Sequence, residues 1–243
     1  MAQLTSDVVP DSHTELGPLL TLPEHETLRA ALRAGAANVE CSLDLGRSTA
    51  RVAVGVEGWV WQGRLFPFLE SCNDRTIYYW DGEAFQPASR YTTSLIKLVP
   101  TQWGPPTFEI DGIKMLPTAQ TSPYADAERK VALIQPRGKA ILDTCGGLGY
   151  FAAWCVQGLA KQVLSYEKNP DVLWLRGLNP CSPQADDVLC MQTNTLDAPL
   201  ASLPGGSVDA ILHDPPRFGI AGELYSQVFY EQLARVLKRK GKL

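Results

Sequence analysis

The chain has 243 residues and a net charge of −4, with 45% hydrophobic and 20% charged residues. These proportions are those of an ordinary globular protein, long enough for one large domain or two modest ones. They argue against a dedicated basic nucleic-acid binder, and no apolar run approaches the ~18 residues that a membrane span needs. The N-terminus lacks the basic start and apolar core of a secretory signal, so a cytoplasmic location is expected.

The six cysteines include no C-x-x-C pair and no histidine at metal-ligand spacing. We therefore expect no metal site. In a cytoplasmic protein these thiols are expected to be reduced, without a disulfide framework.

The first half of the chain is predicted to be β-rich. Residues 1–22 are polar and punctuated by prolines, which predicts a flexible tail, and residues 23–36 favour a short amphipathic helix. From residue 39 to about 115, short β-branched and aromatic runs alternate with turn signals, which is typical of antiparallel hairpins. The strongest hairpin signal is "YYWDGEAF", because Asp-Gly suits a type I′ turn. We take residues 23–120 as one domain.

The second half, residues 121–243, changes to an alternation of strands and helices. This alternation predicts an α/β domain with a Rossmann-like, doubly wound parallel sheet. The closing run "RVLKRKGK" is interpreted as a solvated helix end. The predicted strands are 140–144, 162–166, 187–191 and 208–213, and the predicted helices begin near residues 125, 150, 170 and 223.

A glycine-rich turn follows the first of these strands, in "AILDTCGGLGYFAAW". Glycines at a strand–helix turn let the backbone approach a cofactor closely, although Gly147 and Gly149 alone match dinucleotide binders as well. Asp143 lies four residues before Gly147, where a carboxylate would repel a pyrophosphate and suit a cationic group. Glu167, at the end of the second strand, can accept both ribose hydroxyls. These residues favour S-adenosylmethionine (SAM) over NAD.

The fourth strand ends in "HDPPRFG", which places His213, Asp214, Pro215 and Pro216 at the carboxyl edge of the sheet. With "ILDTCGGLG" and Glu167, this motif resembles the class I SAM-dependent methyltransferases. The match of "LDTCGGLGY", "YEKNP" and "HDPPRFGIAGELYS" extends the resemblance to a group of predicted methyltransferases best known from archaea. It covers residues 95–243 well and residues 40–95 loosely, and it implies the fold and the cofactor SAM.

The chain departs from the family pattern at three places. Cys145 replaces the first glycine of the turn, and no base to activate its thiol is evident, so a small packed residue beside the cofactor is favoured over a nucleophile. Asn194 stands where an acidic residue commonly meets the adenine amino group, and its carbonyl can accept the same hydrogen bond. Arg217 replaces the aromatic residue that stacks on the acceptor in the D-P-P-Y motif, which puts methylation of the amino group of a planar base in doubt.

The resemblance assigns the catalytic turn to Asp214, Pro215 and Pro216, which would hold an acceptor amine in line with the methyl group and accept its proton. His213 is a second candidate proton acceptor, or else a packed residue at the strand end. Arg217 and Phe218 are the candidate residues for contacting the acceptor, because a guanidinium binds anionic groups such as phosphate or carboxylate. A surface ion pair is an equally good explanation of Arg217.

Three functions stay open from the sequence. The first is methyl transfer from SAM to RNA or to a small-molecule amine. The second is an aminopropyltransferase of the polyamine type, which would need a dense acidic cluster that "HDPP" does not introduce. The third is a non-catalytic relative, because the chain is expected to stop before the fifth to seventh strands of the methyltransferase sheet.

Overall fold

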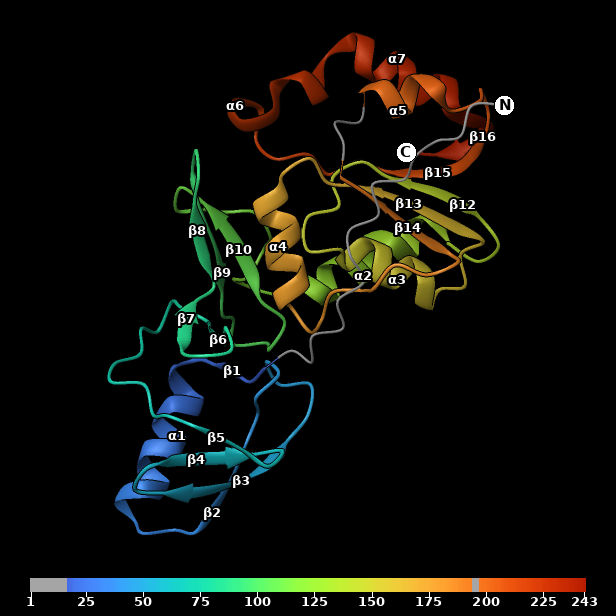
Figure 1. Cartoon of the computed structure of the whole chain (residues 1–243). Helices are drawn as coiled ribbons and strands as arrows, with labels where there is room; N and C mark the ends of the chain where they lie inside the picture. Colours follow the sequence, from blue (N-terminus) through green and yellow to red (C-terminus); the bar gives the residue numbers. More distant parts are fainter. Residues whose placement is uncertain (1–16, 194–196) are drawn as a thin grey trace.

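The computed structural model describes residues 17–193 and 197–243. Within these residues the chain forms three small antiparallel sheets, followed by one parallel sheet with helices on both faces (Figure 1). The predicted β-rich N-terminal region and the Rossmann-like α/β fold are therefore both confirmed. Among the described helices, none combines the length and apolar composition that crossing a bilayer requires.

The N-terminal part holds one long helix, α1 (Leu22–Arg33), which begins with a proline in its first turn. Leu19 and Leu20 are buried and form β1, which pairs with β6, so the predicted tail 1–22 is wrong at its end. The strands of this part are β1 (Leu19–Leu20), β2 (Asn38–Cys41), β3 (Ala50–Gly55), β4 (Gly58–Trp61), β5 (Arg64–Phe66), β6 (Tyr78–Trp80), β7 (Phe85–Pro87), β8 (Ser89–Tyr91), β9 (Leu95–Val99), β10 (Thr107–Ile110) and β11 (Ile113–Lys114).

Two Asp-Gly turns join hairpins in this part, and they differ in backbone conformation. The β6–β7 hairpin predicted from "YYWDGEAF" is present, but a positive φ occurs at Gly82 alone (116°). The β10–β11 turn has positive φ at both Asp111 (48°) and Gly112 (79°). Only the second turn meets the type I′ requirement of positive φ at both central residues.

The parallel sheet has the strand order β14-β13-β12-β15-β16, which in chain order is 3-2-1-4-5. This order places a topological switch point between β12 and β15, where ligands bind in open α/β sheets. The strands are β12 (Ala140–Asp143), β13 (Gln162–Tyr166), β14 (Leu189–Gln192), β15 (Val208–Leu212) and β16 (Leu237–Lys242). The helices are α2 (Pro123–Ile134), α3 (Tyr150–Gln157), α4 (Pro170–Leu178), α5 (Asp197–Ser202), α6 (Phe218–Ala221), η1 (Gly222–Tyr225) and α7 (Gln227–Val236).

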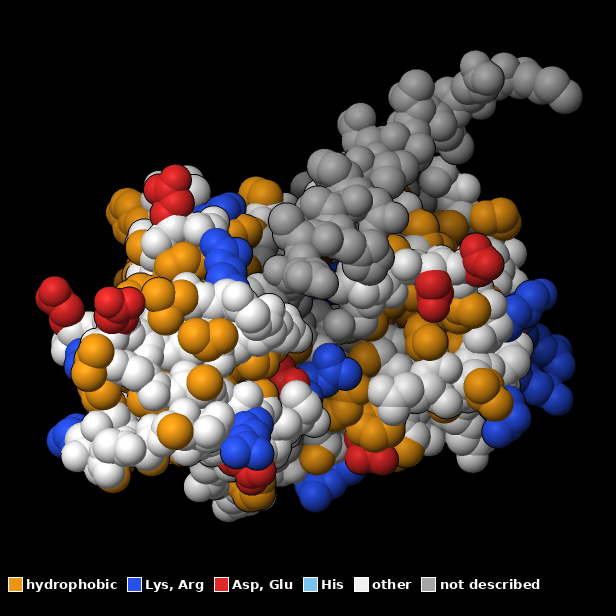
Figure 2. Space-filling model, turned by 60° about the horizontal axis from the view of Figure 1, so that its bottom comes forward, with side chains coloured by type: hydrophobic (Ala, Val, Ile, Leu, Met, Phe, Trp, Pro, Cys, Tyr) orange, Lys and Arg blue, Asp and Glu red, His pale blue; other side chains and the backbone are white. Residues whose placement is uncertain are grey.

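The fifth strand, β16, corrects two predictions. Helix α7 ends at Val236, and Leu237 adopts an extended backbone (φ −74°, ψ 133°) that starts a strand parallel to β15. The run "RVLKRKGK" is therefore not a helix end, and the chain does not stop before the fifth strand. Leu237 packs against the core under α7, so strand pairing outweighs the helix propensity of the lysines and the one arginine that follow. Basic side chains gather at this end of the molecule (Figure 2).

The core explains why the two halves of the chain hold together. Ile141 and Leu142 of β12 point to opposite faces of the sheet, the first toward α2 and α3 and the second toward α5 and α7. A third cluster joins Phe108 of β10 to Leu148 and Val172 of the α/β part. Packing is thus continuous across the predicted boundary at residue 120.

Candidate functional site

A cavity of about 190 Å³ lies at the carboxyl ends of β12, β13 and β15. One buried water needs only about 10–15 Å³, so the cavity has room for a molecule much larger than water. Segments 144–148, 166–169 and 214–216 form its floor, and β10, the two residues after β11 (115–116) and α2 form its roof. It therefore sits at the switch point that the strand order defines.

The glycine turn after β12 carries one side of the cavity. Gly147 and Gly149 both have positive φ, 49° and 81°, which side chains with a Cβ rarely adopt. Glu167 is half-buried on the cavity wall, and its Oε2 accepts a hydrogen bond from the Gly147 backbone N–H at 3.0 Å. Its Oε1 accepts from the backbone N–H of Asn169 at 2.9 Å. The carboxylate is thus fixed beside the turn by two main-chain donors.

A buried arginine supports the glycine turn from below. Arg176 of α4 is 4% exposed, and its guanidinium donates to the carbonyl oxygens of Gly146 (3.0 Å) and Gly147 (3.1 Å). A Cβ on Gly146 would lie 2.8 Å from Arg176 Nη2, so this glycine makes room for the guanidinium. Sequence reasoning missed Arg176, although the single basic residue in the otherwise largely apolar helix "DVLWLRGL" was a usable signal.

Asp143 does not lie on the cavity wall, where the sequence reasoning expected it to meet a cation. Its side chain is 1% exposed beneath the turn, and Oδ2 accepts a hydrogen bond from Ser165 Oγ at 2.8 Å. Burial raises the pKa of Asp143 to about 6, although Ser165 and the positive charge of Arg176 lower it again in part. Asp143 therefore belongs to the polar support under the turn.

Cys145 and His213 take positions that disfavour chemistry. The Cys145 thiol lines the cavity, but burial raises its pKa to about 12, so the reactive thiolate is scarce at neutral pH. His213 is not among the cavity-lining residues. Its Nδ1 lies 2.8 Å from Thr144 Oγ1, its ring packs beside Phe229 and Tyr230, and burial lowers its pKa. The structure thus agrees with the packed alternative for His213.

Asp214, Pro215 and Pro216 lie on the cavity wall across β12 from Glu167, because β15 and β13 flank β12 on opposite sides. The Tyr225 hydroxyl donates to the Pro216 carbonyl oxygen at 2.7 Å and fixes this turn. Asp214 Oδ2 accepts from Lys130 Nζ at 2.6 Å. Sequence reasoning did not single out Lys130, because its partner is 84 residues away along the chain.

The remaining candidates lie elsewhere. Arg217 is exposed and Phe218 is 70% exposed, and neither lines the cavity, so the structure places both outside the predicted acceptor pocket. Asn194 falls outside the described residues. In the part of the chain that the structure describes, no three His, Cys, Asp or Glu side chains come together in a way that would hold a metal ion.

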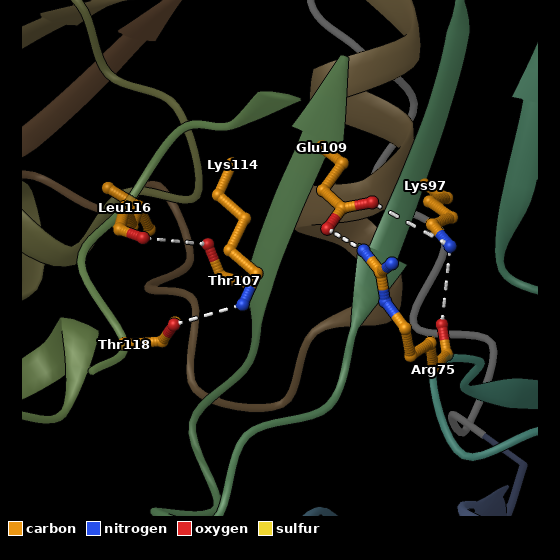
Figure 3. A network of polar contacts seen from close by, with 7 residues as sticks. All are labelled: Arg75, Lys97, Thr107, Glu109, Lys114, Leu116 and Thr118. Carbon is orange, nitrogen blue, oxygen red and sulfur yellow. Dashed lines mark hydrogen bonds and ion pairs between the residues drawn. The ribbon is translucent and has the colours of Figure 1, made fainter. Parts of the chain in front are cut away.

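The roof of the cavity is held by an ion-pair network on its outer side (Figure 3). Glu109 of β10 is 1% exposed, pairs with Arg75 and lies 3.7 Å from Lys97 of β9. Because neighbouring residues of a strand point to opposite faces, Phe108 and Ile110 face the cavity instead. The Phe108 ring reaches the turn closely enough that a Cβ on Gly147 would lie 3.5 Å from it.

Comparisons with known proteins support the fold. An uncharacterized protein of Methanocaldococcus jannaschii is 40% identical over 166 residues, which cover 67% of this chain and 56% of that protein. The chain thus spans about half the length of this curated relative. No family model matches the sequence.

Among solved structures, a spermidine synthase in complex with the transition-state analogue AdoDATO matches with a TM-score of 0.51 and 17% identity, covering 62% of this chain and 54% of that one. The spermidine synthase of Thermotoga maritima matches with a TM-score of 0.50 and 16% identity, covering 68% and 60%. A SAM-dependent methyltransferase of Mesorhizobium loti matches at a TM-score of 0.33, too low to carry an argument. The likeness to the two spermidine synthases is one of fold: the chain shares their α/β arrangement.

Proposed function

We propose that the cavity binds an S-adenosyl cofactor and that the chain belongs to a SAM-dependent methyltransferase. The observation that carries this proposal is the position of Glu167. Its two oxygens are fixed by the backbone N–H groups of Gly147 and Asn169, at the wall of a ligand-sized cavity over a glycine turn. A carboxylate fixed in this way is a suitable acceptor for a pair of ribose hydroxyls.

The charges of the cavity favour a cationic cofactor over a dinucleotide. Its wall carries three carboxylates, those of Asp126, Glu167 and Asp214, and two lysines. Both lysines already pair with carboxylates, Lys130 with Asp214 at 2.6 Å and Lys168 with Glu223 at 2.5 Å. A pyrophosphate would meet net negative charge here, whereas a sulfonium would be attracted.

The floor of the cavity separates two roles. In this proposal the turn at Gly147 and the carboxylate of Glu167 contact the adenosyl group, and Asp214 with its two prolines contacts the acceptor. The support is that the two sets of residues line the cavity on opposite sides of β12. A SAM sulfonium supplies an activated methyl group, so the chain has mainly to orient the acceptor and exclude water. Asp214 is the group placed to orient an acceptor hydrogen and take up its proton.

An aminopropyltransferase is the second candidate, and the fold likeness to spermidine synthases favours it. Such an enzyme binds a polycationic acceptor, for which free carboxylates would be required. In this cavity an internal ammonium, that of Lys130, already neutralises Asp214. The methyltransferase proposal therefore takes precedence.

Calorimetric titration tests the proposal. SAM and S-adenosylhomocysteine are expected to bind the wild-type chain, and NAD is not. Glu167→Ala is expected to weaken adenosyl binding at least a hundredfold, because two hydrogen bonds to a charged acceptor contribute about 1.5–3 kcal/mol each and 1.4 kcal/mol is tenfold. The exposed Glu128→Ala on α2 is the matched control. Binding of NAD alone, or a loss of less than about threefold in Glu167→Ala, would contradict the proposal.

A further inference from the structure

The acceptor side of the cavity contains a three-residue charge cluster, formed by Lys130, Asp126 and Asp214. Lys130 Nζ lies 3.0 Å from Asp126 Oδ2 and 2.6 Å from Asp214 Oδ2. Lys130 and Asp126 share a face of α2 because they are one turn apart, whereas Asp214 reaches them from the end of β15. The ammonium therefore bridges the roof and the floor of the cavity.

This ammonium is held in its charged form. Partial burial alone would lower the pKa of Lys130, but its hydrogen bonds to Asp214 and Asp126 outweigh burial and raise it. Nζ also lies 5.6 Å from the centre of the Phe151 ring, within the range of a cation–π contact. The cluster thus carries a net charge of −1, with the positive charge between its two carboxylates.

The surface around the cluster is apolar. Phe108, Ile110 and Met115 project from β10 and the hairpin segment that follows it, and Leu224 of η1 lies on the opposite wall. A molecule that enters beside Asp214 therefore contacts hydrocarbon on its body and, at its polar end, a carboxylate that is already paired with an ammonium. Such a surface favours an uncharged polar group: a second ammonium placed beside Asp214 would be repelled by the adjacent Lys130, and an anion would meet the net negative charge of the cluster.

We propose that Lys130 determines acceptor specificity by occupying the position that a cationic amine would take beside Asp214. The acceptor class that follows is a molecule with an apolar body whose reacting end is uncharged, and polyamines are excluded. The role of this molecule as an acceptor rests on the proposed methyltransferase function. The exclusion of polycations is a property of the cavity that can be measured by itself.

Titration of spermidine, a tricationic probe, tests this exclusion. Lys130→Met removes the ammonium at nearly constant volume, and we expect it to bind spermidine at least tenfold more tightly than the wild-type chain. Lys130→Arg keeps the positive charge and is expected to behave as wild type. The double variant Lys130→Met/Asp214→Asn should lose the gained affinity, because it removes the carboxylate that would hold the probe.

Lys238→Met is the matched control, because Lys238 forms a similar half-exposed pair with Asp209 (2.7 Å) outside the cavity. It changes the net charge of the chain by the same amount and should leave spermidine binding unchanged. Wild-type affinity equal to that of Lys130→Met, or an equal gain in Lys238→Met, would overturn the proposal. If the thermal midpoint of Lys130→Met falls, Lys130→Gln replaces it in the same comparison.

S-adenosylhomocysteine titrated into the same proteins separates the two proposals. If it fails to bind while Lys130→Met gains spermidine affinity, the methyltransferase proposal is wrong and the charge exclusion stands. If it binds while Lys130→Met gains nothing, the specificity proposal is wrong by itself.

Discussion

Replacing Arg176 by methionine should be among the most damaging single changes in the α/β part. The guanidinium donates to the carbonyl oxygens of Gly146 and Gly147, and the side chain is 4% exposed. Each hydrogen bond from a charged donor contributes about 1.5–3 kcal/mol, so the loss of two amounts to about 3–6 kcal/mol. Asp143 also loses its nearby positive charge. Against a typical unfolding free energy of 5–15 kcal/mol, this is a large fraction.

Urea denaturation followed by circular dichroism measures this loss, with Arg235→Met as the control. Arg235 also donates to several backbone carbonyls, among them those of Leu200 and Leu203 at 2.7 Å, but it is exposed. Water can replace its hydrogen bonds, so the control should lose less than about 1 kcal/mol. Equal losses in the two variants would refute the reasoning, because burial would then not be what makes Arg176 important.

Two further predictions concern the same turn. The pKa of about 6 for buried Asp143 lies above its ordinary value of 3.8, so its stabilising contribution is present below pH ~4 and is lost as the pH rises through 6. Relative to Asp143→Asn, the wild-type chain should lose about 3 kcal/mol of unfolding free energy between pH 4 and 7, and parallel pH curves would contradict this. Gly149→Ala should destabilise the chain by more than about 1 kcal/mol, because φ is 81° and the new Cβ would lie 2.8 Å from Pro183 Cδ. Gly177→Ala, on the open face of α4, should instead stabilise the chain by about 0.5–1 kcal/mol, because alanine favours the helix. Thermal melts that reverse this order would count against both glycine assignments.

The parts of the site that could be predicted from sequence are those whose residues lie within a few positions of one another along the chain. The glycine turn and Glu167 each follow directly from a strand and its next few residues, so local pattern was sufficient to place them on one sheet edge. Strand β16 was missed because its lysines and its one arginine favour helix, and only the packing of Leu237 and pairing with β15 decide otherwise.

Arg176 and Lys130 could not be placed in the same way. Their roles depend on partners 29 or more residues away along the chain, at Gly147 and Asp214. For His213 the sequence left two alternatives open, and only the packing of its ring against Phe229, 16 residues further along the chain, separates them.

The roof over the cavity has a consequence for how this chain could acquire new acceptors. Phe108, Ile110 and Met115 come from a segment that contributes nothing to the carboxylate beside the glycine turn. Under the proposed function, the residues that hold the cofactor and part of the wall that contacts the acceptor therefore belong to separate stretches of sequence. Substitutions in one hairpin can reshape the acceptor wall while the turn and Glu167 keep their hydrogen bonds, so a library confined to residues 108–116 is the economical starting point for redirecting the protein.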